Sequence, residues 1–302
     1  PLPEKVSFFM EKDLLFDPSV DWSYSNSGFF LLSRIIESVT GIPYTEYAKK
    51  NVLLPAGIRD TYFGECISEP PPNYINGYGS GDSGRMIKAD TILWAWTASA
   101  GDVVSTIEDM GRWMDALSDG KIISAEMLSK AWSSYVLKDG KKVNYGYGWG
   151  ISEDYGEKFI FHGGSITGFV SQTVYIPAKN IYVAAISNNT SVNVSTVVNQ
   201  AAARLAGIET NDPPEISMSI EELRRLTGVY EMNRSGARLT SNFGDTKLYR
   251  HITEEGGQLF VQPTGKAKSK LIPFGKNSFY TEKNKTRFVF YDNSKGSNDG
   301  IM

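Results

Sequence analysis

The chain has 302 residues, a formal net charge of -3, 41% hydrophobic residues and 22% charged residues, a composition typical of soluble globular proteins. This charge balance, without any local run of Lys and Arg, excludes a strongly basic nucleic-acid surface, and no apolar stretch approaches transmembrane length. The single cysteine, Cys66, excludes an internal disulfide, and only His162 and His251 are available as histidine ligands. We therefore expect neither a metal nor another cofactor.

The first third of the chain alternates helical patterns with Gly and Pro breaks. Apolar residues at helical spacing predict a helix over residues 4–13 and a longer amphipathic helix from Phe29 to Val39, which Gly41 ends as a C-cap. The loop over residues 21–26 therefore lies at a helix N-terminus. A second helix is predicted over residues 44–53.

The following segments are less regular. Residues 68–85 are rich in Pro, Gly, Asn and Ser and predict a lid or binding loop. Ser105-Thr106-Ile107-Glu108 fits a capping box that begins a helix, and residues 124–135 predict another. In residues 145–150 aromatics alternate with Gly, which suits either a ligand site or a packed strand edge.

The centre of the chain predicts an antiparallel sheet. Three runs of strand-type residues cover 158–161, 169–176 and 181–187, and residues 177–180 form the turn between the last two. The last two runs are almost uniformly apolar, so helices must cover at least one face, and residues 193–205 can supply one. The fold class is therefore α+β, with an antiparallel sheet flanked by helices.

The last third of the chain has a different period. Residues 208–220, which include Pro213 and Pro214, predict a linker after a body over residues 1–207. Short apolar runs separated by Gly, Asn and Lys turns over residues 221–302 predict a small all-β antiparallel barrel.

Two short motifs carry possible chemistry. In Phe161-His162-Gly163-Gly164-Ser165, glycines after a strand can free the Ser165 amide to bind a developing oxyanion; the alternative is a plain bulge or turn. In Tyr24-Ser25-Asn26, the positive end of the following helix can hold the Tyr24 hydroxyl and lower its pKa. The alternative there is that Ser25 or Asn26 only caps the helix.

Four segments in order resemble one family: residues 22–26 with the apolar helix after them, residues 101–106, residues 145–150, and His162-Gly163-Gly164. The family is the penicillin-recognising serine hydrolases, in the branch of class C beta-lactamases, D-Ala-D-Ala peptidases and esterases. The resemblance covers about the first two thirds of the chain, and the C-terminal domain resembles the lipocalin-like extension of some members.

The resemblance implies a role for each motif residue. Tyr24 would be the general base and acid, and Asn26 would hold the substrate amide and the catalytic lysine. His162, Gly163 and Gly164 stand where many members have Lys-Thr-Gly, and the Ser165 amide would form half of the oxyanion hole.

The family nucleophile belongs to a Ser-x-x-Lys pair upstream of the tyrosine motif, and no such pair precedes Tyr24 here. We expect no Ser-x-x-Lys spacing anywhere in these 302 residues, and we expect an N-terminal segment of the same protein to complete the fold. The resemblance implies a serine acyl-transfer hydrolase of amides, esters or lactams, in an extracytoplasmic location. The alternatives are a non-catalytic sensor derived from that family, a degenerate member, or a lipocalin-like carrier.

Overall fold

The computed structural model describes Ser7, Glu11 and residues 13–64, 74–81, 85–90, 99–154, 156–208, 214–231, 249–282, 286–292 and 298–301. It separates into two compact units, Pro1–Thr210 and Asn211–Met302, which are considered individually below. Within the described ranges, no helix is both long and apolar enough to cross a membrane. The helix predicted over residues 4–13 and Cys66 lie outside the residues that can be described, apart from Ser7, Glu11 and Asp13.

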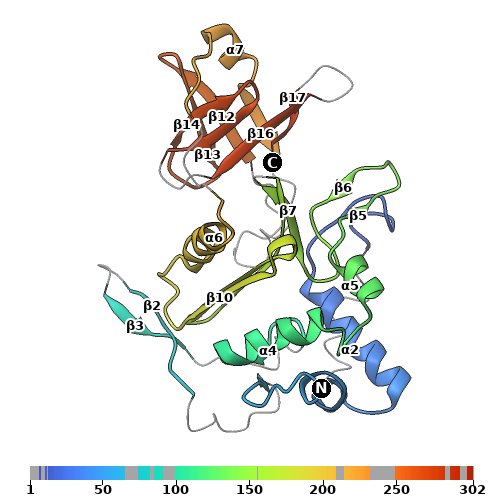
Figure 1. The fold of residues 1–302 in the computed structure, drawn as a ribbon. Helices are drawn as coiled ribbons and strands as arrows, with labels where there is room; N and C mark the ends of the chain where they lie inside the picture. Colours follow the sequence, from blue (N-terminus) through green and yellow to red (C-terminus); the bar gives the residue numbers. More distant parts are fainter. Residues whose placement is uncertain are drawn as a thin grey trace. The chain divides into compact units, whose positions relative to one another are not determined.

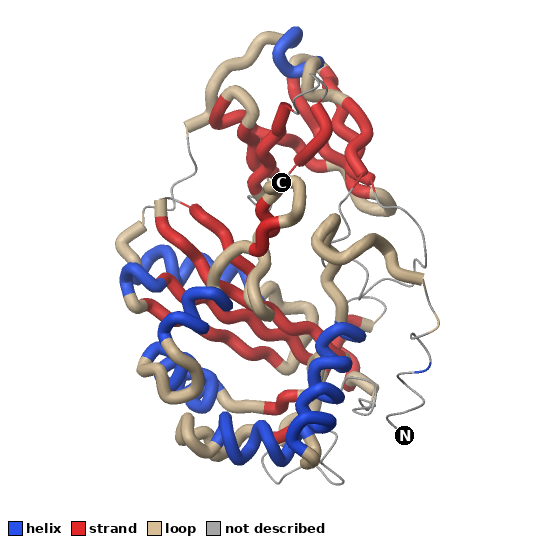
Figure 2. Tube along the Cα trace, turned by 90° about the vertical axis from the view of Figure 1, so that its right-hand side faces the viewer, coloured by secondary structure: helices blue, strands red, loops and turns tan. Residues whose placement is uncertain are grey.

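A four-stranded antiparallel sheet forms the centre of the first unit. Its order is β10-β9-β8-β7, with β7 over Gly150–Asp154, β8 over Glu157–Ile166, β9 over Phe169–Ile176 and β10 over Ile181–Ser187. The strands lie side by side in Figure 2. The predicted strands and their antiparallel pairing are confirmed, with a 3-10 turn over Pro177–Lys179 before β10. One detail differs: β8 continues to Ile166, so the two glycines lie inside a strand and not after it.

Helices cover both faces of this sheet, as Figure 1 shows for α6 and α4 on opposite sides of β10. On one face α6, over Val194–Leu205, places Val198 and Ala202 against Val174 and Ile176. On the other face, Met114 of α4 packs against a group of strand residues: Ile151, Ile160 and Tyr175. Burying each such aliphatic side chain contributes about 1.5–3 kcal/mol, so the two layers fix the sheet between them.

The long N-terminal helix forms where the sequence predicts it but does not bury the predicted face. Helix α2 spans Asn26–Thr40 and ends at Gly41, which has a φ of 74° and whose backbone N–H donates a hydrogen bond to the Glu37 carbonyl, so Gly41 is the C-cap. Leu32, Ile35 and Val39 are 50%, 57% and 80% exposed, and this apolar stripe faces away from the described body. The periodicity identified a helix correctly, whereas burial depends on a partner that local spacing cannot show.

Two further predictions shift by a few residues. Helix α4 spans Ile107–Ser118, and its N-cap is Thr106, whose hydroxyl accepts from the Asp109 amide; the predicted capping box is therefore displaced by one residue. Helix α5 ends early, because Tyr135 already belongs to a short strand. The remaining elements of this unit are α3 (Tyr44–Ala48), a π-helical turn (Lys49–Leu53), α5 (Ala125–Ala131), and the paired short strands β1 (Tyr62–Phe63) with β4 (Val103–Val104), β2 (Tyr78–Ser80) with β3 (Met86–Lys88) and β5 (Tyr135–Val136) with β6 (Lys142–Val143).

The β2–β3 hairpin is fastened to the turn between β8 and β9 through two glycines. A Cβ on Gly77 would lie 2.8 Å from the Gly168 Cα, and a Cβ on Gly168, whose φ is 81°, would lie 2.7 Å from the Gly77 Cα. The Tyr78 backbone N–H also donates a hydrogen bond of 2.8 Å to the Asn188 carbonyl. Only two residues without side chains allow the backbones to approach this closely.

The second unit is a seven-stranded antiparallel sheet in the order β11 to β17. Helix α7, over Ile220–Arg224, precedes it and begins with a complete capping box between Ser219 and Glu222. Phe279, Leu259 and Phe290 are at most 1% exposed in its core. No ladder pairs β11 with β17 among the described residues, so the predicted antiparallel sheet is observed while its closure into a barrel stays a prediction. The strands are β11 (Gly228–Glu231), β12 (Tyr249–Glu255), β13 (Gln258–Pro263), β14 (Ser269–Gly275), β15 (Ser278–Thr281), β16 (Arg287–Asp292) and β17 (Asn298–Ile301).

Candidate functional site

The register of the central sheet determines which way His162 faces. In β8, Ile160 is buried against α4, and His162, two residues later, projects from the same face. His162 pairs with Thr173 of β9, whose hydroxyl donates to the His162 carbonyl at 3.2 Å. The histidine is therefore held on the α4 side of the sheet, beyond the end of the buried α4 contact.

The loop before α2 brings Tyr24 to this histidine. The Tyr24 and His162 ring centroids are 6.2 Å apart although 138 residues separate them in the chain, so the two predicted residues converge. Ser25 is the N-cap of α2 and accepts from the Gly28 amide at 3.0 Å. Asn26 is the first residue of the helix, and among the described residues no hydrogen bond or ring contact joins it to His162. The capping alternative thus holds for Ser25 and leaves the roles of Tyr24 and Asn26 as predictions.

Tyr145 joins this group, and the sequence alone did not single it out. Its hydroxyl lies 2.9 Å from His162 Nε2, and its ring lies 5.9 Å from the Tyr24 ring and 5.2 Å from the Trp22 ring. The pairing of Gly150 with Phe161 carries the preceding residues toward His162, and a bridge joins Tyr145 to Gly150. The alternation of aromatics and Gly was the available signal, but only the strand register shows which aromatic reaches the site.

The glycines of residues 145–150 are explained by packing. A Cβ on Gly146 would lie 2.1 Å from the Ala131 carbonyl oxygen, and one on Gly150 would lie 2.5 Å from the Phe161 ring. The packed-edge interpretation therefore holds for these two glycines, whereas a ligand site in this segment stays a prediction.

Side chains of the neighbouring strand β9 occupy the space beside Gly163 and Gly164. A Cβ on Gly163 would lie 2.7 Å from Gln172 Oε1, and one on Gly164 would lie 2.6 Å from Ser171 Oγ. These glycines accommodate cross-strand side chains, so an approaching ligand is not needed to explain them. The ladder from β7 reaches only to Phe161, so among the described strands the β8 edge over residues 162–166 pairs with β9 alone. The oxyanion role predicted for the Ser165 amide, which lies in this edge, stays a prediction.

The electrostatics of Tyr24 differ from the prediction. Burial raises the pKa of the Tyr24 hydroxyl above its ordinary value of 10.0, whereas the helix end was expected to lower it. Burial, followed by the proximity of Tyr24, also raises the pKa of Tyr145. The prediction was wrong because desolvation of the charged form outweighs a helix end whose cap position is already occupied by Ser25.

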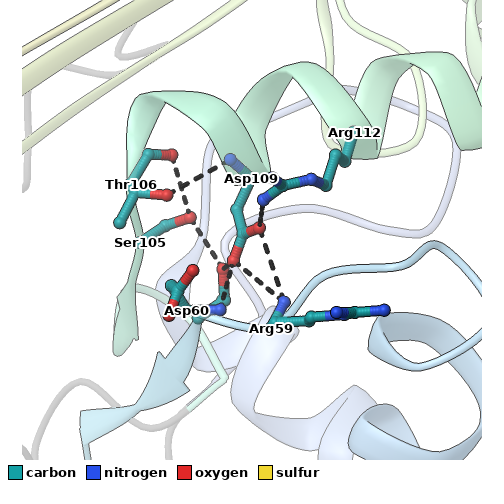
Figure 3. A network of polar contacts seen from close by, with 7 residues as sticks. Arg59, Asp60, Ser105, Thr106, Asp109 and Arg112 are labelled. Atoms are coloured by element: carbon teal, nitrogen blue, oxygen red, sulfur yellow. Dashed lines mark hydrogen bonds and ion pairs between the residues drawn. The ribbon is translucent and has the colours of Figure 1, made fainter.

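A buried carboxylate anchors the helix that supports this face. Figure 3 shows Asp109 extending from α4 toward Arg59 and Asp60. Asp109 Oδ2 accepts from the Asp60 amide at 2.7 Å and the Thr61 hydroxyl at 2.9 Å, and Oδ1 accepts from Arg112 at 2.5 Å. The Asp109 side chain is 0% exposed. Burial alone would raise the pKa of Asp109, but the bonds from Arg112, Thr61 and the backbone outweigh it and lower the pKa.

A Ser-x-x-Lys spacing does occur once, at Ser118-Asp119-Gly120-Lys121, contrary to the expectation of none. It lies at the C-terminal end of α4, and Lys121 Nζ is bonded to Asp119 at 2.8 Å with both side chains 56% exposed. Ser118 and Lys121 therefore lie at a solvent-exposed helix end, and among the described residues no contact joins them to Tyr24. Among the described residues, no cluster of His, Cys, Asp and Glu is arranged to hold a metal ion.

Comparisons with known proteins agree with these observations. The Beta-lactamase family profile matches residues 3–208. The chain belongs to the beta-lactamase family. This assignment places it among the penicillin-recognising serine hydrolases that its motifs resemble.

Individual relatives are distant and longer. Penicillin-binding protein 4* of Bacillus subtilis is 24% identical over 278 residues, which are 88% of this chain and 60% of the relative. A D-aminopeptidase of Gluconobacter oxydans is 23% identical over 78% of this chain and 44% of its own length. The octameric penicillin-binding protein homologue from Pyrococcus abyssi shares 26% identity at a TM-score of 0.63, covering 96% of this chain and 67% of that one. This chain thus spans about half the length of these two curated relatives.

Proposed function

We propose that the complete protein is a serine acyl-transfer hydrolase that cleaves amides or esters. The observation that carries the proposal is the convergence of Tyr24 and His162, from two separate family motifs, at 6.2 Å within a chain of this family. Relatives named as D-aminopeptidases support an amide substrate.

In the proposed reaction the serine of a Ser-x-x-Lys segment outside these 302 residues attacks the acyl carbon. Tyr24 accepts the serine proton and later returns it to the leaving group, and Asn26 holds the substrate amide. The Ser165 amide donates to the oxyanion. Because the pKa of Tyr24 is raised in this chain, the proposal requires the lysine of that segment to lie beside the phenol, where a positive charge favours the phenolate.

The same segment would cover surfaces that are open here. The exposed stripe of Leu32, Ile35 and Val39 on α2 is apolar, and β10 pairs with β9 on one side only among the described strands. An additional helix against α2 and an additional strand beside β10 would bury both. An extracytoplasmic location and a closed, lipocalin-like barrel in residues 221–302 belong to this proposal.

The place of a family lysine is taken here by His162, which also bears on the substrate. A neutral imidazole is no fixed cation for a substrate carboxylate, whereas a lysine would be one. We therefore expect esters and amides with neutral ends to be better substrates than penicillins. Efficient penicillin hydrolysis by the complete protein would contradict this expectation.

The test of the function is single-turnover acylation of the complete protein by a chromogenic ester. Tyr24→Phe should lower the acylation rate by about 10²- to 10⁴-fold, the usual range for a general base. Tyr147→Phe is the matched control, because Tyr147 is 63% exposed and should leave the rate unchanged. Equal rates for Tyr24→Phe and wild type would remove Tyr24 from this role, and binding without turnover by the wild type would favour the sensor alternative.

A further inference from the structure

The hydrogen bonds of His162 determine its tautomer. Nδ1 lies 2.7 Å from the Gly163 carbonyl oxygen, and because a carbonyl oxygen only accepts, Nδ1 carries a hydrogen. In the neutral ring Nε2 is then an acceptor, and the Tyr145 hydroxyl at 2.9 Å must donate to it. The hydroxyl therefore uses its only hydrogen on His162.

This arrangement decides what the Tyr145–His162 pair offers to a bound molecule. Both ring nitrogens of His162 are engaged, by Gly163 and by Tyr145. The remaining capacity of Tyr145 is the lone pairs of its Oη, which accept hydrogen bonds and donate none. The pair is thus suited to a substrate N–H and has no donor left for a carboxylate.

The rings around Tyr145 favour a positive charge at the same place. Trp22 and Tyr24 lie 5.2 and 5.9 Å from the Tyr145 ring, and the Tyr24–Tyr145 contact is edge to face. Aromatic faces attract ammonium groups, most strongly where water is partly excluded. All three rings are partly buried. An acceptor oxygen among aromatic rings is a combination that recognises an ammonium ion.

We infer that Tyr145 is a specificity-determining residue whose hydroxyl oxygen accepts a hydrogen bond from the free α-ammonium group of an aminoacyl substrate, with Trp22 and Tyr24 lining the same place. The inference rests on the proposed function for the position of the acyl group and extends it by naming the group that is recognised. Its tests below need no nucleophile, so they can be carried out on the 302-residue chain.

The first test is nitrogen NMR of the histidine rings, at a pH well above the ordinary imidazole pKa of about 6.5. The chain has only two histidines, so His251→Gln assigns the signals of His162. We expect the proton on Nδ1 and a hydrogen-bonded, unprotonated Nε2. Tyr145→Phe should move the Nε2 signal toward that of an imidazole without this bond, and Tyr147→Phe should leave it in place. A proton on Nε2 in the wild type, or an unchanged signal in Tyr145→Phe, would overturn the inference.

The second test is binding of D-alaninamide and of N-acetyl-D-alaninamide, which differ in the ammonium group. A hydrogen bond to a charged group corresponds to a preference of at least about tenfold in Kd for D-alaninamide. Tyr145→Phe should lose this preference, and Tyr147→Phe should keep it. Equal affinities in the wild type, the same preference in Tyr145→Phe, or no binding of either amide would each contradict the inference.

The proposed function and the ammonium site can be refuted separately. If the complete protein hydrolyses no ester or amide while the 302-residue chain still prefers D-alaninamide through Tyr145, the proposed function fails and the ammonium site stands. If hydrolysis proceeds through Tyr24 without any preference for a free ammonium group, the function stands and the role of Tyr145 is wrong.

Discussion

Asp109 provides the sharpest test of how this fold is held together. Its carboxylate is fully buried and receives bonds from the Asp60 amide, the Thr61 hydroxyl and Arg112 (Figure 3). Replacing it with alanine leaves a guanidinium and backbone amides without their acceptor. Arg112 is 46% exposed and can be rehydrated, so the cost comes mainly from the Asp60 amide and the Thr61 hydroxyl, which lose their acceptor. Leaving a buried donor unpaired costs about 1–3 kcal/mol, and we expect Asp109→Ala to lower the free energy of unfolding by about 2–4 kcal/mol.

Asp109→Asn separates charge from shape. The side-chain amide keeps one acceptor oxygen but points its own N–H groups at donors, so we expect Asp109→Asn to lower the free energy of unfolding by about 2–3 kcal/mol. The measurement is urea unfolding of each variant, followed by tryptophan fluorescence. Asp119→Asn is the control on the same helix, because the Asp119–Lys121 pair is exposed and should contribute less than about 1 kcal/mol.

The dependence of stability on acidic pH gives a second test of Asp109. The folded-state pKa of Asp109 is lowered, so its contribution is fully present above the unfolded value of about 3.9 and is lost as pH falls below it. Asp109→Asn should therefore lose less stability than wild type on acidification. A cost below about 1 kcal/mol for Asp109→Ala, or equal acid slopes, would refute the reasoning.

Three other expectations follow from packing and burial. Gly146→Ala should lower the free energy of unfolding by at least about 1–3 kcal/mol, because the added Cβ would clash with the Ala131 carbonyl. Gly111→Ala should raise the free energy of unfolding by up to about 1 kcal/mol, because Gly111 lies inside α4 with open space around it. Urea unfolding of both variants tests the two expectations. Burial raises the pKa of Tyr182 to about 12, so the neutral phenol stabilises the fold fully below pH 10 and this stabilisation is lost between pH 10 and 12. The loss amounts to at most about 2.7 kcal/mol of unfolding free energy. Thermal melts of Tyr182→Phe should therefore show a smaller loss of stability over this pH range than those of the wild type. The isolated 302-residue chain should self-associate in light scattering, and Leu32→Lys on the exposed α2 stripe should reduce it; a monomeric wild type would contradict the expectation.

The parts of the fold that the sequence predicted are those governed by local spacing. The strands β9 and β10, the turn between them and the C-cap at Gly41 all depend on neighbouring residues, and each forms as predicted. The strand β8 also forms, but it extends past the predicted end to Ile166. The α2 stripe shows the limit. Its period marks a helix, but whether Leu32 is buried depends on a partner elsewhere, and here it is 50% exposed.

Some features of the candidate site could be predicted from the sequence and others could not. Tyr24 and His162 could be found as motifs, and in the structure their ring centroids lie 6.2 Å apart. Tyr145 could not be chosen in advance, because its position follows from the register of β7 on β8. The direction of the Tyr24 pKa could not be predicted either, because it depends on burial that arises only when the loop packs against other segments.

The contact between Gly77 and Gly168 has a consequence for how this family member can diverge. At the base of the β2–β3 hairpin, neither Gly77 nor Gly168 has room for a methyl group. Farther along the hairpin, Met86 and Ile87 are 58% and 50% exposed. Substitutions can therefore accumulate toward the tip without moving the turn that follows Ser165. New side chains can therefore be introduced on the outer part of the hairpin while β8 and β9 stay in register.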